Sequence, residues 1–138
     1  AQTPETDSLE NLLKAHRKAD TIKVNLLNAL ALRFYLVDND RLMAYAEEAL
    51  ELSERLRYKK GRAEAIRLKG LFYYNTSENR QALDLFQESF EIYDQIGDKR
   101  GLSLSLNYLG MASWKLGSVF LVISEDSTFL MIFRLAYW

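Results

Sequence analysis

Apolar residues recur every three or four positions over most of this chain, and short polar stretches interrupt the pattern at regular intervals. Between residues 21 and 37, the helical spacing is carried by Val24, Leu27, Leu30, Ala31 and Phe34. The polar run at 38–40 marks a stop and a restart, because short polar side chains favour turns and caps over helix interiors. The pattern therefore predicts a chain of helices joined by short turns.

The same alternation continues on both sides of this segment. A leading helix is expected to start at Asp7 or Ser8, with Leu9, Leu12 and Leu13 on its apolar face. Helices are also predicted at about 41–58, 62–74, 80–96 and 101–117, and Gly97 should end the helix at 80–96. The expected inward positions are Leu42, Ala46, Ala49, Leu50 and Leu56 in one helix, and Ala82, Phe86, Phe90 and Tyr93 in another.

The chain also matches itself at an offset of 40 residues without a gap. Residues 21–60 align with residues 61–100, placing Leu26 over Ile66 and Lys59 over Lys99. Residues 101–117 continue the match, with Gly110 below Gly70. A period of this length indicates helical repeats that bury their apolar faces against their neighbours. We therefore expect an all-α fold, a right-handed solenoid of antiparallel helix pairs with about three repeats and an N-terminal capping helix.

Composition favours one domain. The 138 residues are 49% hydrophobic and 27% charged, and 18 Lys and Arg residues nearly balance 19 Asp and Glu residues. This balance gives no global charge that would favour nucleic acid or an acidic membrane surface. The absence of cysteine removes disulfides, thiolate nucleophiles and cysteine-ligated zinc. The expected organisation is a polar lead at 1–6, a repeat domain at 7–117 and an atypical apolar segment at 118–138.

Catalytic chemistry is hard to find in these residues. The single histidine, His16, has no cysteine, second histidine or suitably spaced carboxylates nearby, so we expect a structural role for it. The basic cluster between Arg55 and Arg62 is interleaved with glutamates and is a weak phosphate site. The chain is thus predicted not to be an enzyme and to need no cofactor or metal.

The repeat pattern resembles tetratricopeptide repeats of the longer variety. The Leu-Gly pair of that family's first helix appears as Leu109-Gly110 and, less well kept, as Lys69-Gly70, and the first unit has Ala29-Leu30 instead. The small residue that opens the second helix is Ala82. This resemblance covers about residues 21–117. The small residues at these places let helices approach closely. The resemblance implies a scaffold that binds a protein or peptide, with a partner that varies between members of the family.

Two phrases, AEEALELSERLRYKKG and FQESFEIYDQIGDKRG, resemble the repeat regions outside the membrane of bacterial sensor histidine kinases and nucleotide cyclases. This implies a sensing module in signal transduction and a periplasmic or extracytoplasmic location, with a cytoplasmic one as the alternative. The small Ala1 followed by a polar lead is also what signal-peptide cleavage often leaves. Trimming at a domain boundary would leave the same start.

In the resembled family, the first helices of successive repeats line a concave groove. Aromatic, arginine and asparagine side chains there suit peptide recognition, since they anchor side chains, hold carboxylates and pair with the peptide backbone. For the apolar positions of this face, burial between repeats is the alternative role. The residues expected to form the partner-binding groove are Phe34, Arg67, Tyr74, Asn75, Asn107, Met111 and Trp114.

The repeat chemistry stops after Gly117, where two apolar runs at 119–123 and 129–133 flank the polar SEDST. Neither run approaches the 20 or so apolar residues needed to span a bilayer. We favour a helix over 119–135 that packs on the array or on a second copy of the chain, giving a homodimer through residues 119–138. A two-stranded hairpin is the alternative, although such a hairpin would be marginal alone. An altered reading frame would also explain the abrupt change.

Overall fold

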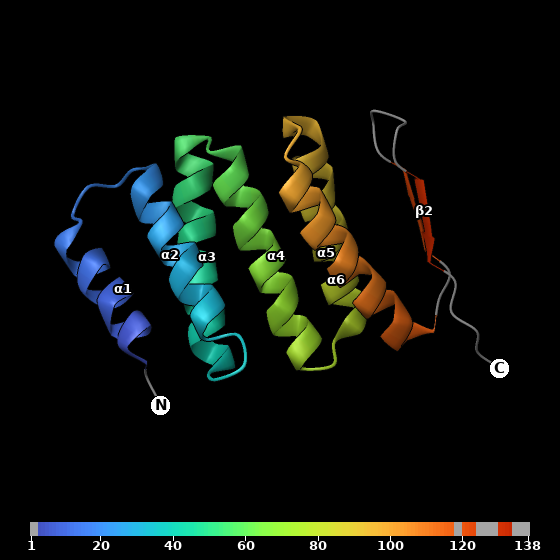
Figure 1. Cartoon of the computed structure of the whole chain (residues 1–138), viewed down its shortest axis with the longest axis horizontal. Helices are drawn as coiled ribbons and strands as arrows, with labels where there is room; N and C mark the ends of the chain where they lie inside the picture. Colours follow the sequence, from blue (N-terminus) through green and yellow to red (C-terminus); the bar gives the residue numbers. More distant parts are fainter. Residues whose placement is uncertain (1–2, 118–119, 124–129, 134–138) are drawn as a thin grey trace.

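The computed structural model describes residues 3–117, 120–123 and 130–133. In this part of the chain, six helices are followed by two short strands. Figure 1 shows the helices standing side by side in a row, with the N-terminus at one end and the strands at the other. The elements are α1 (Pro4–Ala15), α2 (Thr21–Arg33), α3 (Asn39–Leu56), α4 (Lys59–Asn75), α5 (Asn79–Ile96), α6 (Lys99–Leu116), β1 (Phe120–Ile123) and β2 (Leu130–Phe133).

The body of the chain is all-α, as predicted, and each helix packs on the next one in sequence. In addition, α2 contacts α4 and α4 contacts α6, so these three helices form one layer. Helices α3 and α5 pack against the other side of this layer (Figure 1). The layer formed by α2, α4 and α6 corresponds to the first helix of each sequence unit.

Helix ends repeat every twenty residues. Arg57, Ser77, Gly97 and Gly117 all have positive φ angles, of 55°, 63°, 70° and 62° respectively. After the first three of these residues, the next backbone amide bonds back across the helix end, from Tyr58 to Ser53, Glu78 to Tyr73 and Asp98 to Tyr93, at 2.8–3.0 Å. These bonds satisfy carbonyls that the helix itself leaves free. The repeat is thus expressed in backbone conformation as well as in packing.

Helices α2 and α3 are capped by Asp20 and Asp38, whose carboxylates accept bonds from the amides of Lys23 and Arg41, and the cap at Asp38 agrees with the restart expected at 38–40. The first helix differs from the expectation. It begins at Pro4, because the hydroxyl of Thr3 accepts the amide of Thr6 and proline suits the first helical position. The stretch predicted as a polar lead therefore already contains the first turn of α1.

The core runs between the two layers. The predicted apolar face of α2 is buried throughout, as is that of α5. Two inward assignments were wrong: Leu56, in the last turn of α3, and Leu12 in α1 are both exposed, whereas Leu52 is buried. Helix α3 has apolar residues on two neighbouring faces, so the sequence alone did not show which of these faces points to the core.

Close helix packing depends on Gly70. A Cβ atom placed on Gly70 would lie 2.5 Å from Cε1 of Phe86, which is fully buried and stacks on Tyr108 with ring centroids 5.3 Å apart. This confirms the expectation that small residues in this position make room for bulky neighbours. Gly70 therefore fixes the distance between α4 and α5.

The chain after Gly117 differs from the favoured prediction. Residues 120–123 and 130–133 do not form part of a helix but pair as an antiparallel ribbon in which Phe120 faces Phe133 and Ile123 faces Leu130. The sequences FLVI and LMIF are rich in β-branched and aromatic residues, which favour strands. Strand β2 lies against α6. The hairpin alternative is thus the correct one for these eight residues, and the rest of the predicted 119–135 helix lies outside the described residues.

None of the described helices is long and apolar enough to cross a membrane.

Candidate functional site

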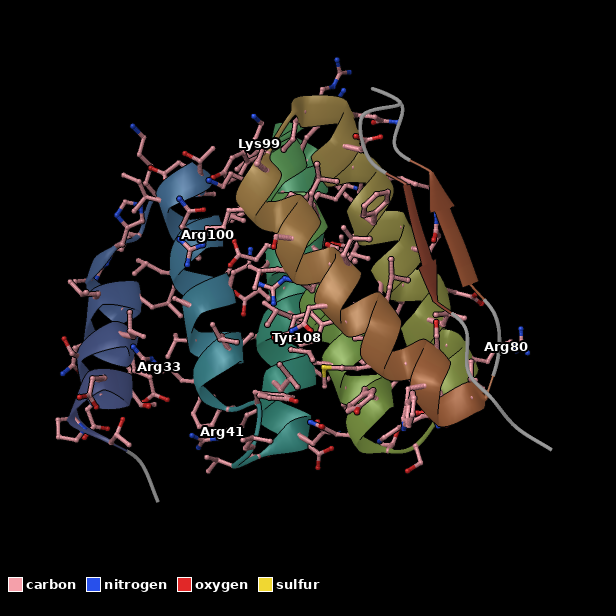
Figure 2. All side chains as sticks on the ribbon, turned by 45° about the vertical axis from the view of Figure 1, so that its right-hand side comes forward. Arg33, Arg41, Arg80, Lys99, Arg100 and Tyr108 are labelled. Atoms are coloured by element: carbon pink, nitrogen blue, oxygen red, sulfur yellow. The ribbon has the colours of Figure 1, made fainter. Side chains whose placement is uncertain are left out.

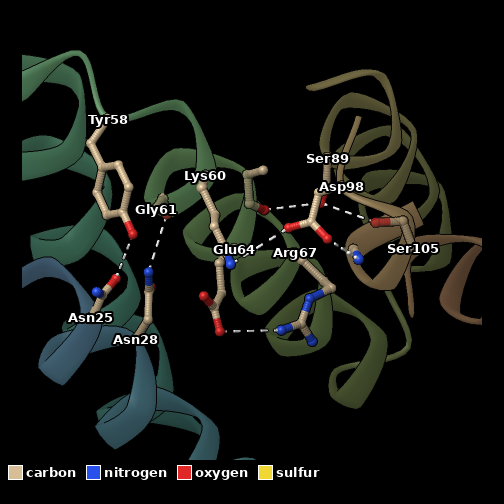
Figure 3. Close-up of polar contacts among 12 residues, drawn as sticks. Asn25, Asn28, Tyr58, Lys60, Gly61, Glu64, Arg67, Ser89, Asp98 and Ser105 are labelled. Atoms are coloured by element: carbon tan, nitrogen blue, oxygen red, sulfur yellow. Dashed lines mark hydrogen bonds and ion pairs between the residues drawn. The ribbon is translucent and has the colours of Figure 1, made fainter. Parts of the chain in front are cut away.

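A pocket of about 430 Å³ opens on the layer formed by α2, α4 and α6, near the ends where α4 and α6 begin. Asn25, Ala29 and Leu32 of α2 form one wall, and the rest is formed by residues at the starts of α4 and α6 and within them, together with Tyr93 of α5. Figure 3 shows the polar contacts around it, which run from α2 across α4 to α6. The volume is in the range of sites that hold a small ligand or one or two side chains of a peptide.

Arg67 lies at the base of this pocket. Its residue surface is only 3% exposed, although it carries a full positive charge. One Nη is 3.6 Å from Oε1 of Glu64, and the guanidinium lies 5.6 Å from the centre of the Tyr108 ring. Nε is buried and has no hydrogen-bond partner within the described residues. A buried charge is costly unless it is fully paired. Arg67 therefore retains unused capacity to donate a hydrogen bond.

The rim of the pocket carries two more cations. Lys60 Nζ is 3.8 Å from Oδ2 of Asp98, whose other oxygen accepts the amide of Gly101 and caps α6. Arg100 is exposed and makes no ion pair within the described part of the chain. In Figure 2, Arg100 lies on the side of α6 that faces α2, whereas Lys99 lies above it, at the start of α6. The charged lining thus comprises three cations and two carboxylates.

Tyr93 closes the inner side of the pocket. Burial raises the pKa of its hydroxyl to about 12, and the positive charge of Arg67 opposes this effect only in part. At neutral pH the hydroxyl is protonated, as that of a tyrosine with an ordinary pKa also is, and it can donate a hydrogen bond. Polar groups of this kind fix the orientation of a bound ligand.

Two tyrosines lie near the pocket-lining Tyr108. Tyr35 follows the C-terminal end of α2 and Tyr74 lies in the last turn of α4, whereas Tyr108 lies in the middle of α6, and all three are half-buried. Burial raises the pKa of Tyr35, with further contributions from Tyr108 and Tyr74. These tyrosines are therefore close enough to interact. Lys115 Nζ lies 3.7 Å from the centre of the Tyr74 ring and donates to the Tyr74 carbonyl.

The structure separates the residues predicted for the groove. Phe34 is buried and stacks on Tyr45, with ring centroids 5.9 Å apart, so it belongs to the core. Asn75 is exposed, but its amide nitrogen donates to the Tyr35 carbonyl at 2.9 Å and to Oδ1 of Asn39 at 3.0 Å. It therefore ties the end of α4 to the α2–α3 turn. Of the seven residues, only Arg67 lines the pocket.

Asn107, Met111 and Trp114 share one face of α6, because they are separated by four and three residues. Asn107 is exposed, Met111 is half-buried, and Trp114 is 72% exposed. An exposed tryptophan offers a large apolar surface that a partner could cover. This face adjoins the pocket-lining face of Leu104 and Tyr108, one residue position away on the same helix.

Scans against protein-family models, curated proteins and solved structures found no match to the chain. What the chain binds must therefore be argued from its own geometry.

Sequence reasoning missed most of the pocket. Lys60 and Arg100 are one repeat of 40 residues apart in the chain, and so are Tyr58 and Asp98. Each pair lies where α4 and α6 begin. The cation that recurs at this place, as Lys60 and as Arg100, was the signal that could have predicted the pocket. Tyr108 was overlooked in favour of its neighbour Asn107, because the phase of α6 was set one position too early.

Other candidate chemistry has structural roles. His16 Nε2 bonds to Oδ1 of Asp20 at 2.7 Å, and this bond is the main reason that the pKa of Asp20 is lowered. From the basic cluster, Arg62 is held by Glu54 and Glu88 at 3.7 and 3.1 Å. Within the described residues, no group of three His, Cys, Asp or Glu side chains is placed to hold a metal ion.

Proposed function

We propose that the chain is a protein-interaction module that binds a peptide or an extended segment of a partner protein on the surface of α2, α4 and α6. The observation that carries this proposal is the pocket between these helices, with the buried and incompletely paired Arg67 at its base. The tyrosines at the pocket and the exposed Trp114 of α6 supply apolar contact area. Aromatic and arginine side chains are the residues that most often dominate binding energy at protein interfaces.

The layered row of antiparallel helices supports a tetratricopeptide-like solenoid, in which the α2–α4–α6 layer would be the concave side. The 40-residue sequence repeat, the helix ends at twenty-residue intervals and the contacts of α2 with α4 and α4 with α6 all fit that architecture. A role as the sensor region of a bacterial signalling protein is part of the same proposal. The sequence encoded on either side of the chain tests it: a preceding signal peptide and a following membrane helix with a kinase or cyclase would support an extracytoplasmic location.

Selection from a random peptide library tests the binding proposal directly. Peptides selected on the full chain should lose most of their affinity when Asn107 and Trp114 are both replaced by Ala. The matched control replaces Glu47 and Arg80, exposed residues on α3 and α5, and should leave affinity unchanged. Arg67 is omitted from the groove variant because truncation of so buried a residue would also affect stability. Equal loss in both double variants, or in neither, would contradict the proposed surface.

A second candidate function is self-association through the C-terminal segment. It is favoured by the β1–β2 ribbon, whose eight residues are all apolar and which contains only two strands in the described part of the chain. A two-stranded ribbon leaves unpaired backbone groups at its edges, and such edges readily pair with another chain. Light scattering after size exclusion should show a dimer that Val122→Pro converts to a monomer with unchanged helical circular dichroism. A monomer at high micromolar concentration before substitution would overturn this candidate.

A further inference from the structure

Equivalent positions of the three repeat units become more exposed along the row of helices. Phe34 in α2 is 4% exposed, Tyr74 in α4 is half-buried and Trp114 in α6 is 72% exposed, each forty residues after the previous one. The position seven residues earlier changes from the buried Leu27 in α2 to the exposed Asn107 in α6. One face of α6 is therefore open where the same face of α2 is covered.

The second helix of each unit provides this cover. In the first unit, Phe34 stacks on Tyr45 of α3, with ring centroids 5.9 Å apart. In the second unit, Phe86 of α5 lies against Gly70 of α4. Helix α6 is the last described helix of the row (Figure 1), and β2 contacts it but leaves Trp114 exposed. The repeat therefore indicates a helix as the cover that this face of α6 accepts.

The repeat also indicates which side chain such a helix would carry. A Cβ atom on Gly70 would lie 2.5 Å from the Phe86 ring, so the glycine makes room for the aromatic side chain. The corresponding residues in the first unit are Leu30 and Ala46, which reverse the sizes and are both fully buried. One large and one small residue thus fill the space between the two helices of a unit. Because α6 has Gly110 at this position, the large residue is left to the covering helix.

We propose that this face of α6 binds an amphipathic helix of a partner protein, with an aromatic residue placed opposite Gly110 and beside Trp114. Such a helix would take the place on α6 that α3 has on α2 and α5 has on α4. The exposed indole supplies a large apolar contact, and the glycine supplies a recess for an anchoring side chain. This inference rests on the proposed function, since it names the form of the partner segment that would contact Asn107 and Trp114.

The probe is a peptide of residues 78–97, which has the sequence of α5, added to the full chain. It carries Phe86 and no tryptophan, so in a Trp138→Phe background the tryptophan fluorescence reports Trp114 alone. Binding should shift this fluorescence to the blue, because burial removes the indole from water. The same peptide with Phe86→Ala should bind about tenfold more weakly, as is usual when a central aromatic side chain of an interface is truncated.

A substitution in α6 tests the recess itself. Gly110→Leu copies the first unit, in which Leu30 is paired with Ala46, and should reverse the preference, so that the Phe86→Ala peptide binds more tightly than the Phe86 peptide. Gly110 is half-exposed and leucine favours helices, so this variant should keep the helical circular dichroism of the wild type. Asn25→Ala, on the pocket wall, is the control and should change the affinity for neither peptide.

Several results would overturn the inference: no fluorescence shift at millimolar peptide, equal affinity for both peptides, or an unchanged preference in Gly110→Leu. If Gly110→Leu does not fold, Trp114→Ala decides, because it should weaken binding of a fluorescein-labelled peptide about tenfold or more. A blue shift that grows with protein concentration in the absence of peptide would show a second copy of the chain on this face. That result would also overturn the inference.

Failure of the proposed function would look different. Library peptides that depend on Asn107 and Trp114, but bind wild type and Gly110→Leu equally, would support the interaction module and remove the docked helix. A preference that reverses in Gly110→Leu, while no library peptide is selected, would support the docked helix and remove the pocket surface of α2, α4 and α6.

Discussion

Arg57 ends α3 in the same left-handed backbone conformation with which Gly97 ends α5, forty residues later. Glycine adopts this conformation freely, whereas a residue with a Cβ atom is strained by about 1–2 kcal/mol. Arg57 is exposed, and its backbone amide bonds to the helix end like that of Gly97. The end of α3 is therefore strained at Arg57, whereas the same conformation at Gly97 causes no such strain at the end of α5.

The first prediction is that Arg57→Gly stabilises the protein. Relief of the strained conformation should exceed the added entropy of the unfolded chain, giving a gain of about 0.5–1 kcal/mol in the free energy of unfolding. Urea denaturation followed by circular dichroism measures it. Arg57→Ala is the matched control, because it removes the same side chain and retains the Cβ atom. A gain in both variants, or in neither, would show that backbone strain is not the cause.

The second prediction is that Gly70→Ala destabilises the protein by about 1–3 kcal/mol, the usual cost of overpacking a core. The new Cβ would lie 2.5 Å from Phe86, which cannot move because it is fully buried. Thermal or urea denaturation gives the value. Combining Gly70→Ala with Phe86→Leu should cost less than the two single changes added together, since the smaller side chain makes room for the methyl group. Strict additivity would argue against this contact.

The third prediction compares two asparagines on α2. The buried Asn28 donates to the Gly61 carbonyl at 3.1 Å, and Asn28→Ala should cost about 0.5–1.5 kcal/mol of stability because this buried hydrogen bond is lost. Asn25, three residues earlier, is exposed and bonds to the Tyr58 hydroxyl, so Asn25→Ala should cost much less. Denaturation midpoints of both variants provide the comparison. Equal losses would contradict a structural role for the buried bond.

The fourth prediction concerns alkaline pH. Because the pKa of Tyr93 is raised from 10 to about 12 by burial, the native state holds this proton more tightly than the unfolded state. The stabilisation is present in full below pH 10 and falls by up to about 1.4 kcal/mol per unit as pH rises from 10 to 12. Stability of wild type and Tyr93→Phe, measured at pH 9, 10 and 11, should therefore diverge only above pH 10, with wild type losing more. Parallel curves would place the Tyr93 pKa near its ordinary value.

The helices were predictable from sequence because the 40-residue match and the apolar spacing gave the same answer. Gly97 and Asp38 marked helix boundaries correctly, since each carries a local chemical preference that does not depend on the rest of the fold. The hairpin was placed second because local periodicity does not separate short apolar strands from short buried helices. Only the pairing of β1 with β2 decides between them.

The candidate site was harder to predict than the fold. Arg67 and Phe34 were both assigned to the groove because their positions match the groove face of the resembled repeat family, but Phe34 is a core residue. A rotation of one position on a helix separates an outward side chain from an inward one, and sequence spacing does not determine the rotation so finely. The pocket also needs Asp98 and Arg100, which lie at a helix junction that periodicity does not describe.

The tie between Lys115 and the Tyr74 carbonyl has a consequence for folding speed. It spans 41 residues, and the tie from Asn75 to Tyr35 spans 40. Bonds between neighbouring units therefore close loops of moderate length and do not require the two ends of the chain to meet. Most helix contacts join helices that are adjacent in sequence. Chains dominated by such local contacts have low contact order and fold in microseconds to milliseconds. A newly made helix pair could thus dock on the previous one while the remainder is still being synthesised.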